Sequence, residues 1–591
     1  MSINPGKVEI CFDNGAAEGV DNDCANGVDD GCPQLFCPMG GSVDQDYTVD
    51  PNTNGYLVDC NIQVQGDLDP QFYISDGVTL FFMDGLGLYI GPQNFSEYGE
   101  LVIDGNDLGV VMTGWTEADE DPLEPGAWKG IQVGHRARAS EIEGLDISYG
   151  GGFGGAIVVE GDDTELYISN STISLSSGYG VEILAGTVRL EDNIIENNAL
   201  GGVSCDEGCL DETPNSSPGN VISNNGGYPL SLLARSVGGL DGTGLFSGND
   251  NDFIVIDGGQ VSTTASWFAH DLVPYLVTSD ISIGDSPSVT LVVEDGVEMH
   301  FDLDVVLNVG DTGSANFFVS GNVDGVVMTS AQGEQNQGDW AGIHIEPSAG
   351  LVAITGLTLS YAGSSSGYYD GGISIDGSYW GDFSLTDSFI EESAGSGLKA
   401  YGGPVAISGS SFLRNAKYGI NSPNSWTIDE FSENIVSDNE NGQMRLSATD
   451  VAILGDDSTF SATEDGADEI VVLAGVQHLL VADANWLDHD MVYRIKQMVT
   501  VSHANLPVLR LKDGAELAFD GTDVGLEVVG GSLVIEDIDG LQNVILRGHD
   551  ESSGSWAGVE LHTAAVSNDL RGFELRHGGA VSAGITLGSG V

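Results

Sequence analysis

A tryptophan-centred stretch occurs three times in this chain, at residues 126–131, 339–343 and 555–559. In each copy a tryptophan (Trp128, Trp340 or Trp556) is followed two residues later by glycine and three residues later by a β-branched residue, and an apolar run precedes it. The copies are about 215 residues apart, which is a long internal repeat. Repeated units stack because one unit cannot bury its own apolar face. The repeat therefore constrains the fold before any local prediction is made.

A shorter repeat lies inside each long unit. Residues 170–173, 192–198 and 219–225 each combine isoleucine or valine with asparagine, and short alternating strands and Gly/Asn turns recur every 20 to 27 residues or so. Short strands that are each followed by a tight turn are typical of a β-solenoid, in which the inward aliphatic residues of one coil pack on those of the next coil. The sequence predicts an all-β fold built of super-repeats.

The repeats also predict the domain organisation. We expect a small disulfide-bonded N-terminal module at residues 1–45, a first β-helix unit at 46–265, a second at 266–484 and a partial third at 485–591. The third unit stops shortly after residues 582–587, where no closing cap follows. Since a solenoid needs a cap at each end, we expect either a longer native polypeptide or end-to-end stacking on another copy.

The charge balance narrows the possible partners. Seventeen Lys and Arg residues stand against 90 Asp and Glu, which gives a net charge of −73. Nucleic-acid binding needs a basic surface, so this composition argues against it. It favours an acidic, solvated surface or bound divalent cations. The sequence contains no apolar run of membrane-spanning length, so no membrane span is expected.

Five of the seven cysteines fall in the first 60 residues, among turn-forming and acidic residues. This clustering predicts an oxidising compartment, and an odd number leaves the role of Cys60 open. The disulfide candidates are Cys11, Cys24, Cys32, Cys37, Cys205 and Cys209. For the last two we predict a small loop disulfide in preference to a zinc site, because no second pair of ligands lies nearby.

The N-terminal segment resembles the Cys- and Asp-rich metal-binding motif of secreted bacterial proteins, although Ala25-Asn26 departs from that pattern. The resemblance implies a calcium site whose candidate ligands are Asp21, Asp23, Asn26, Asp29 and Asp30. The alternative is a disulfide knot with solvated acids. The segment is not an EF-hand, because Asn26 stands where that loop requires glycine.

From about residue 50 onwards, the Trp-x-Gly-Ile stretches and the repeated Ile-x-Asn-x-x-Ile motifs resemble the right-handed parallel β-helix repeat proteins of environmental bacteria. The resemblance implies a right-handed parallel β-helix in an extracellular or cell-surface protein. Pectate-lyase-like enzymes share this fold with non-enzymatic surface proteins, so the fold alone does not define an activity.

The resemblance to pectate-lyase-like enzymes implies two kinds of catalytic site. A polygalacturonase-like site needs an Arg-Ile-Lys triplet, but residues 494–496 align with an ordinary strand of the preceding repeat, and no Gly-His-Gly lies before them. A lyase needs a basic residue beside calcium. The candidate bases form two weak groups: Lys129, Arg136 and Arg138, and Arg414, Lys417 and Arg445.

Other recurring residues favour structural roles. Trp267 with His270-Asp271 recurs as Trp486 with His489-Asp490, and a junction is copied at each repeat more often than an active site. The Gly-Ser-Ser-Ser-Gly sequence at 363–367 has the letters of a nucleophile elbow but no helix after it. Trp128, Trp340 and Trp556 are expected at equivalent buried corners. Exposed in a row, they would instead form a sugar-stacking platform.

Together these features favour an extracellular structural or adhesive β-helix protein, such as a surface rod or filament component, stabilised by calcium. Its expected partners are copies of itself or further repeats end to end, and cell-surface glycans. The alternatives are a carbohydrate-active enzyme on an acidic polysaccharide, either a lyase or a hydrolase, and a non-catalytic glycan-binding module. Repetition suits a structural protein or a multivalent binder better than a single catalytic cleft.

Overall fold

The computed structural model describes residues 12–13, 16–17, 32–92, 97–116, 123–367, 370–424, 427–463, 467–473, 479–536, 543–562, 567–580 and 583–588. The chain divides into two compact units. Unit 1 consists of Met1–Asp257 and Ala265–Leu276, and unit 2 of Gly258–Thr264 and Val277–Val591. The division falls in the stretch that contains the sequence boundary at 265/266.

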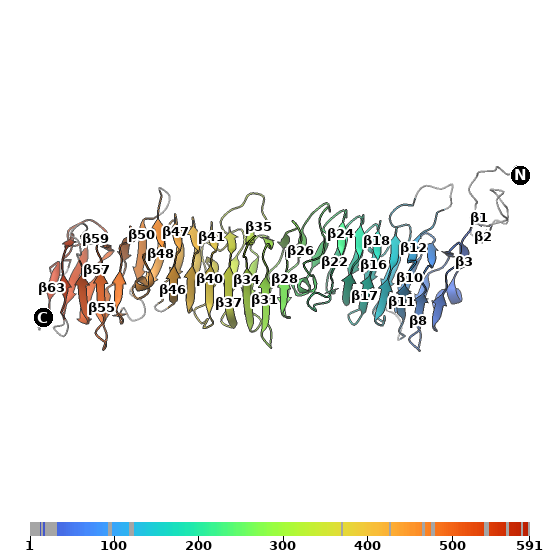
Figure 1. Ribbon diagram of the computed structural model, residues 1–591, viewed down its shortest axis with the longest axis horizontal. Helices are drawn as coiled ribbons and strands as arrows, with labels where there is room; N and C mark the ends of the chain where they lie inside the picture. The colour runs from blue at the N-terminus through green and yellow to red at the C-terminus, as the bar shows by residue number, and fades with distance from the viewer. Residues whose placement is uncertain are drawn as a thin grey trace. The chain divides into compact units, whose positions relative to one another are not determined.

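Unit 1 is a parallel solenoid with three sheets, in which a strand pairs with the strand of the same sheet one turn later (Figure 1). Sheet 1A contains β3 (Gln34–Phe36), β6 (Tyr56–Val58), β9 (Thr79–Phe82), β12 (Val110–Gly114), β15 (Leu145–Ser148), β18 (Thr172–Ser174), β21 (Ile194–Glu196) and β24 (Val221–Ser223). Sheet 1B contains β5 (Tyr47–Val49), β8 (Gln71–Ile74), β11 (Glu100–Asp104), β14 (Ser140–Glu143), β17 (Glu165–Ser169), β20 (Thr187–Glu191) and β23 (Cys209–Leu210). Sheet 1C contains β4 (Ser42–Val43), β7 (Ile62–Val64), β10 (Gly87–Ile90), β13 (Gly130–Val133), β16 (Gly155–Val159), β19 (Tyr179–Ile183), β22 (Gly201–Cys205), β25 (Leu230–Leu232) and β26 (Ile254–Ile256). The remaining strands outside unit 2 are the antiparallel pair β1 (Phe12–Asp13) and β2 (Ala16–Ala17), then β28 (Ala265–Trp267) and β29 (Tyr275–Val277), the last of which ends in unit 2.

Unit 2 has the same construction. Sheet 2A contains β27 (Gly259–Val261), β30 (Ile281–Ile283), β33 (Val306–Val309), β36 (Gly342–Ile345), β39 (Gly371–Ile375), β42 (Ser396–Ala400), β45 (Tyr418–Ser422), β48 (Gly442–Ser447), β50 (Glu469–Leu473), β53 (Val492–Ile495), β56 (Glu516–Phe519), β59 (Val544–Gly548) and β62 (Phe573–Leu575). Sheet 2B contains β31 (Val289–Val293), β34 (Ala315–Ser320), β37 (Ala349–Thr355), β40 (Phe383–Thr386), β43 (Val405–Ser408) and β46 (Ile428–Ser432), and sheet 2C contains β32 (Glu298–Phe301), β35 (Val326–Ser330), β38 (Leu357–Ser360), β41 (Phe389–Glu391), β44 (Ser411–Leu413), β47 (Ile435–Ser437) and β49 (Thr459–Ser461). Two further sheets lie towards the C-terminus. Sheet 2D contains β51 (Leu479–Leu480), β54 (Val499–Ser502), β57 (Gly521–Gly530), β60 (Trp556–Leu561) and β63 (Ile585–Leu587). Sheet 2E contains β52 (Ala484–Trp486), β55 (Val508–Leu511), β58 (Ser532–Ile535) and β61 (Asp569–Leu570).

The predicted fold class, an all-β right-handed parallel solenoid, is confirmed. The described residues contain no α-helix, only the 3-10 helices η1 (Pro38–Gly41), η2 (Ala234–Gly239) and η3 (Asp450–Ile453). β3 and β4 already pair with the solenoid strands β6 and β7. The solenoid therefore includes residues from Gln34 onwards, inside the segment assigned to the N-terminal module.

The core follows from strand alternation. In sheet 1C the residues Leu88, Ile131, Ile157, Val181 and Val203 are successive register partners, and each is at most 1% exposed. Alternate residues of a strand face opposite sides of the sheet, so these five side chains form a continuous aliphatic column on its inner face. A single coil would leave the column open to water, so stacking stabilises the fold by roughly 25 cal/mol for each Å² of apolar surface buried.

Asparagine ladders run beside the aliphatic columns. Asn198 Nδ2 donates to Asn225 Oδ1 at 3.0 Å, and Asn225 Nδ2 donates to Asn249 Oδ1 at 2.9 Å. In unit 2, Asn415 Nδ2 donates to Asn439 Oδ1 at 2.9 Å. These amides also accept hydrogen bonds from the main chain, as Asn198 does from the amide of Ser176 at 3.0 Å. The buried turns are thus satisfied by side chains of the next coil.

The three repeated tryptophans are fully buried and pack on the preceding coil. Their indole rings stack on Phe82, Phe301 and Phe519, with ring centroids 4.2, 4.1 and 4.2 Å apart and interplanar angles of 13°, 9° and 4°. The indole Nε1 atoms donate to the carbonyls of Ser148, Ser360 and Arg576 at 2.8, 2.9 and 2.8 Å. No indole surface is left for stacking on a sugar, so the platform alternative is excluded for these three residues.

Equivalent residues of successive repeats lie in different sheets. Trp340 precedes β36 of sheet 2A, whereas Trp556 opens β60 of sheet 2D. Between them η3 packs against β46 and β52 in place of a strand, so the repeat does not contain a whole number of coils. Within unit 2, the repeat that contains Trp556 is therefore rotated about the solenoid axis relative to the repeat that contains Trp340.

The Trp-His stretches form two closely similar buried junctions. His270 lies between Phe246 and Tyr275, with ring centroids 4.9 and 6.1 Å away, and Tyr275 donates to the carbonyl of Phe268 at 2.7 Å. In the second junction, His489 lies 5.0 Å from Phe460 and 6.3 Å from Tyr493, which donates to the carbonyl of Leu487 at 2.8 Å. Trp267 and Trp486 are buried beside these histidines. This packing matches the structural role expected of both stretches.

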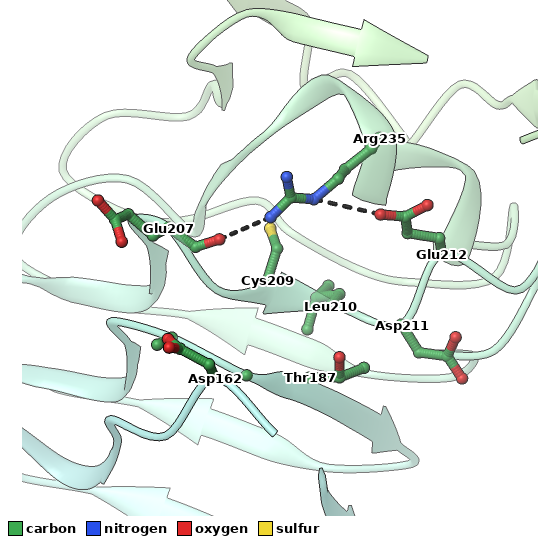
Figure 2. A pocket seen from close by; sticks show the side chains of 10 residues that line it. Asp162, Thr187, Glu207, Cys209, Leu210, Asp211, Glu212 and Arg235 are labelled. Carbon is green, nitrogen blue, oxygen red and sulfur yellow. Dashed lines mark hydrogen bonds and ion pairs between the residues drawn. The ribbon is translucent and has the colours of Figure 1, made fainter. Parts of the chain in front are cut away.

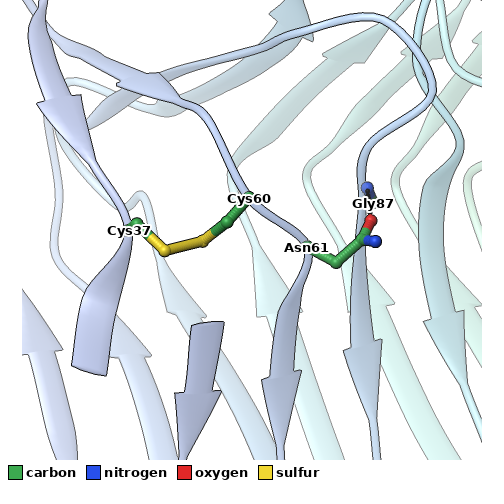
Figure 3. Close-up of a disulfide and its surroundings, with 4 residues drawn as sticks. All are labelled: Cys37, Cys60, Asn61 and Gly87. Atoms are coloured by element: carbon green, nitrogen blue, oxygen red, sulfur yellow. Dashed lines mark hydrogen bonds between the residues drawn. A yellow bond between two sulfur atoms is a disulfide. The ribbon is translucent and has the colours of Figure 1, made fainter. Parts of the chain in front are cut away.

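A disulfide joins Cys37 to Cys60 (Figure 3). It ties η1 to the connection between β6 and β7, and the neighbouring Asn61 side chain accepts a hydrogen bond from the Gly87 amide of the next coil at 3.1 Å. Cys32 is disulfide-bonded as well. Cys60, whose role the sequence left open, thus anchors the N-terminal segment to the solenoid.

Candidate functional site

One column on the outer face of sheet 2A collects basic residues. Lys399, Arg445, Arg494 and Arg547 occupy the same register position in β42, β48, β53 and β59, and the strands between them carry Asn421, Val471 and Ala518 there. Strands in a sheet are about 4.8 Å apart, so a cation recurs about every 9.6 Å along this column. In a chain of net charge −73, this is a local concentration of positive charge.

The buried end of the column is a Lys-Asp-Lys cluster. Asp370 lies between two ammonium groups: Lys399 Nζ is 2.5 Å from its Oδ1, and Lys417 Nζ is 2.5 Å from its Oδ2. Lys399 also donates to the carbonyl of Gly367 at 3.3 Å and lies 4.8 Å from the Tyr401 ring centroid. Lys399 is only 5% exposed and Asp370 9%. The three side chains carry a net charge of +1 in a largely dry setting.

The electrostatics of this cluster limit its chemistry. Burial opposes ionisation of Asp370, but hydrogen bonds and attraction from Lys399 and Lys417 outweigh it and lower the pKa of the carboxyl group. The carboxylate forms an ion pair with each of the two lysines. The cluster can hold an anionic group or fix the preceding loop.

Two other cations of the column, Arg494 and Arg547, are paired with acids. Arg494 donates to Glu469 and to Asp520, each at 2.8 Å, and Arg547 donates to Glu516 at 2.6 Å. Arg494 and Ile495 lie in the regular strand β53, as expected for a chance match to an Arg-Ile-Lys triplet. Partly buried pairs of this kind neutralise neighbouring carboxylates that would otherwise repel one another.

The predicted lyase bases fall in two separate units. In unit 1, Lys129 donates to the Tyr89 hydroxyl at 3.0 Å, and the guanidinium groups of Arg136 and Arg138 lie 5.3 and 3.7 Å from the Tyr98 ring centroid. Arg138 also pairs with Asp69 at 2.8 Å. These contacts are those of surface cations stacked on aromatic rings.

In unit 2, Arg414 pairs with Glu391 and Glu392, Lys417 belongs to the buried cluster, and Arg445 donates to Asn421 at 3.5 Å. The sequence identified Lys417 but missed Lys399 and Asp370, because the three positions come together only when the coils stack. The one available signal was the rarity of lysine in such an acidic chain.

The predicted calcium ligands Asp21, Asp23, Asn26, Asp29 and Asp30, together with Cys11 and Cys24, lie outside the described residues. A different group combines nitrogen and oxygen donors. Glu527 and Glu560 are register partners on β57 and β60, and His562 Nε2 lies 3.5 and 3.1 Å from their carboxylate oxygens. Two adjacent carboxylates repel each other unless a cation lies between them, so a divalent ion would fit there.

The predicted disulfide between Cys205 and Cys209 is wrong for this structure, in which both cysteines are free thiols. Cys205 closes β22 and Cys209 opens β23, and both are buried at a corner of unit 1. The prediction of a disulfide rested on the closeness of Cys205 and Cys209 in the sequence. The main chain of the neighbouring coils already holds this corner, so a covalent bond is not needed to form it.

Residues 129–243 match a protein-family model described as a right handed beta helix region. A comparison with curated proteins gave no match. In the part of the chain that the structure describes, no helix is long and apolar enough to cross a membrane. The family match agrees with the solenoid described above and carries no information about a substrate or partner.

Proposed function

We propose that this chain is an extracellular structural or adhesive β-solenoid, a component of a surface rod or filament, and not an enzyme. The observation that supports this most is the repeated use of the same interior contacts in coil after coil. Tryptophan–phenylalanine stacks, asparagine ladders and aliphatic columns all join one coil to the next. Interactions of this kind stiffen a stack of coils, because each coil is stable only against its neighbours.

The mechanical role is tested by pulling single molecules from both ends in a force spectrometer. A structural solenoid should unfold in successive steps, each a few coils long, at forces that recover when the chain refolds. A single low-force event that releases a whole unit at once would contradict a load-bearing role.

Catalysis is tested separately. The basic residues considered as lyase bases are engaged with aromatic rings, carboxylates or an amide, which supports the non-enzymatic proposal. The chain should release neither reducing sugars nor unsaturated uronates from a panel of acidic polysaccharides, with or without calcium. Turnover of any member of the panel would refute the proposal.

Cation stabilisation is part of the proposal. Carboxylates at this density repel one another, and a divalent ion held between them would lower that repulsion more than screening salt does. The net charge of −73 and the paired carboxylates Glu527 and Glu560 support this part. Calcium at the N-terminal aspartates and association with further copies remain proposals of the same kind, to be tested by calcium titration and by light scattering.

A second candidate function, binding of an anionic glycan, is favoured by one observation. The Lys-Asp-Lys cluster at the end of the basic column of sheet 2A carries a net positive charge on an otherwise acidic chain. Titration calorimetry with acidic oligosaccharides should then show binding that Lys417→Ala weakens and that the control Lys496→Ala, an exposed lysine, leaves unchanged. Equal effects of the two variants would remove the cluster from consideration.

A further inference from the structure

Cys205 and Cys209 flank a turn whose main chain is held by the coil beneath it. The amides of Glu207 and Cys209 donate to the carbonyls of Leu184 and Gly186 at 3.2 and 3.1 Å. Gly208 packs so closely on Ala185 that a Cβ would lie 2.3 Å from its carbonyl carbon. This packing presents the two thiols to each other within hydrogen-bonding range.

The two thiols are not equivalent. Burial opposes ionisation of Cys209, but hydrogen bonds from Cys205 and from neighbouring groups, including the Leu233 amide 3.5 Å from its Sγ, lower its pKa to about 7. Burial, together with the hydrogen bond and charge of Cys209, raises the pKa of Cys205. A low-pKa thiol beside a high-pKa thiol is the arrangement of an attacking cysteine and a resolving cysteine.

Cys209 also lines a cavity of about 630 Å³, whereas Cys205 does not (Figure 2). Arg235 also lines the cavity, where its guanidinium donates to the Glu207 carbonyl at 2.6 Å and pairs with Glu212 at 3.2 Å. The carboxylates of Asp162, Glu207, Asp211 and Glu212 outnumber this one cation among the lining residues. Cys209 is therefore the cysteine at the cavity, whose lining is mostly acidic.

We propose that Cys205 and Cys209 form a thiol–disulfide exchange site that takes small cationic disulfides. The Cys209 thiolate attacks one sulfur of the disulfide, forms a mixed disulfide and releases the first thiolate, which takes up a proton. Cys205 then loses its proton to solvent and attacks the Cys209 sulfur, which releases the second thiolate. The cysteine pair is oxidised by two electrons, and the small disulfide is reduced to two thiols.

The preference for a cation follows from the lining. Four carboxylates against one guanidinium attract a positively charged disulfide and repel an anionic one, and salt weakens both effects. Cystamine, bis(2-hydroxyethyl) disulfide and oxidised glutathione provide cationic, neutral and anionic probes of this prediction. The reaction is independent of the proposed structural function and can be tested on the whole chain.

The experiment incubates the full-length protein, with its other disulfides intact, with each probe and maps the products by peptide mass spectrometry. The wild-type protein should end with a Cys205–Cys209 disulfide, whereas Cys205→Ser should accumulate a mixed disulfide on Cys209. Cys209→Ser should react at least tenfold more slowly, because the remaining thiol does not line the cavity and has a raised pKa. Cystamine should react faster than oxidised glutathione at low salt, and the two rates should converge as salt is added.

A pH profile of the wild-type rate needs no variant. A thiol with its pKa near 7 has about fifty times more thiolate at pH 7 than one with its pKa near 9, and its lower nucleophilicity reduces the gain to about fivefold. The rate should therefore reach half its maximum near pH 7. The proposal is overturned if the purified protein holds a disulfide here that resists dithiothreitol under native conditions, if neither thiol reacts with cystamine, or if both single variants react equally.

Discussion

Replacing Trp340 by alanine tests the packing that joins one coil to the next. The side chain is fully buried, its ring stacks on Phe301 with centroids 4.1 Å apart, and its Nε1 donates to the Ser360 carbonyl at 2.9 Å. The stack contributes about 1 kcal/mol beyond its buried area, and the hydrogen bond about 1 kcal/mol. With the lost apolar burial and the cavity, the total loss of local stability should be about 3–5 kcal/mol.

The measurement is native-state hydrogen exchange followed by mass spectrometry on peptides that contain β32 and β36. Because a solenoid opens locally, exchange in these strands reports the stability of this corner better than a global melting curve does. A loss of about 3–5 kcal/mol corresponds to exchange faster by between about a hundredfold and a few thousandfold. Trp340→Phe, which keeps a ring but leaves the Ser360 carbonyl unpaired, should cost about 1–3 kcal/mol.

Trp380 provides the control, because it is 83% exposed and lies in the same unit. Trp380→Ala should change the local free energy by no more than about 0.5 kcal/mol. Trp128→Ala and Trp556→Ala should reproduce the effect at their own corners, since all three stacks have nearly the same geometry. The reasoning fails if Trp340→Ala accelerates exchange no more than Trp380→Ala does.

Three further predictions concern the junctions, the ladders and bound metal. Burial lowers the pKa of His270 from 6.5 to about 4, so between these pH values the unfolded chain takes up a proton that the folded chain does not. The stability of the junction should therefore fall by up to about 3 kcal/mol as the pH drops from 6.5 to 4. Hydrogen exchange measured from pH 7 to 4 should show that His270→Gln removes this part of the loss. Asn198→Ala leaves the Ser176 amide and the Ile173 carbonyl without their side-chain partner and should cost about 2–4 kcal/mol by denaturant titration, whereas the exposed control Asn106→Ala should be nearly neutral. Zinc should raise the melting temperature more than sodium chloride of equal ionic strength does, and the excess should disappear in His562→Ala; an unchanged excess would place the ion elsewhere.

The sequence alone was sufficient to predict the fold class. Alternating strands of fixed length, repeated turns and the three Trp-centred copies all require a stack of coils, because no other arrangement buries so many short apolar segments. It also predicted that Trp128, Trp340 and Trp556 pack at corners, since a large aromatic residue kept in phase with a repeat serves the packing of that repeat. These inferences rest on local periodicity, which a sequence displays directly.

The candidate sites were less visible in the sequence. Lys399, Asp370 and Lys417 meet across successive coils, and their separation along the chain carries no mark of that contact. The sequence pattern predicts turn positions for the asparagines of the shorter, 20- to 27-residue repeat. In the structure these asparagines form buried ladders whose partners lie one coil away. Cys205 and Cys209 show the opposite error, because neighbours in sequence were assigned a bond that this structure does not contain.

What the sequence by itself determined is the solenoid and its repeat, because both depend on which residues alternate and how often. What only the tertiary structure decided is which side chains share a surface. Lateral contacts depend on how many residues each loop adds to a coil and on where η3 takes the place of a strand, and these set the rotation between Trp340 and Trp556. Register between coils is a cumulative property of all the loops before it, so no short motif encodes it.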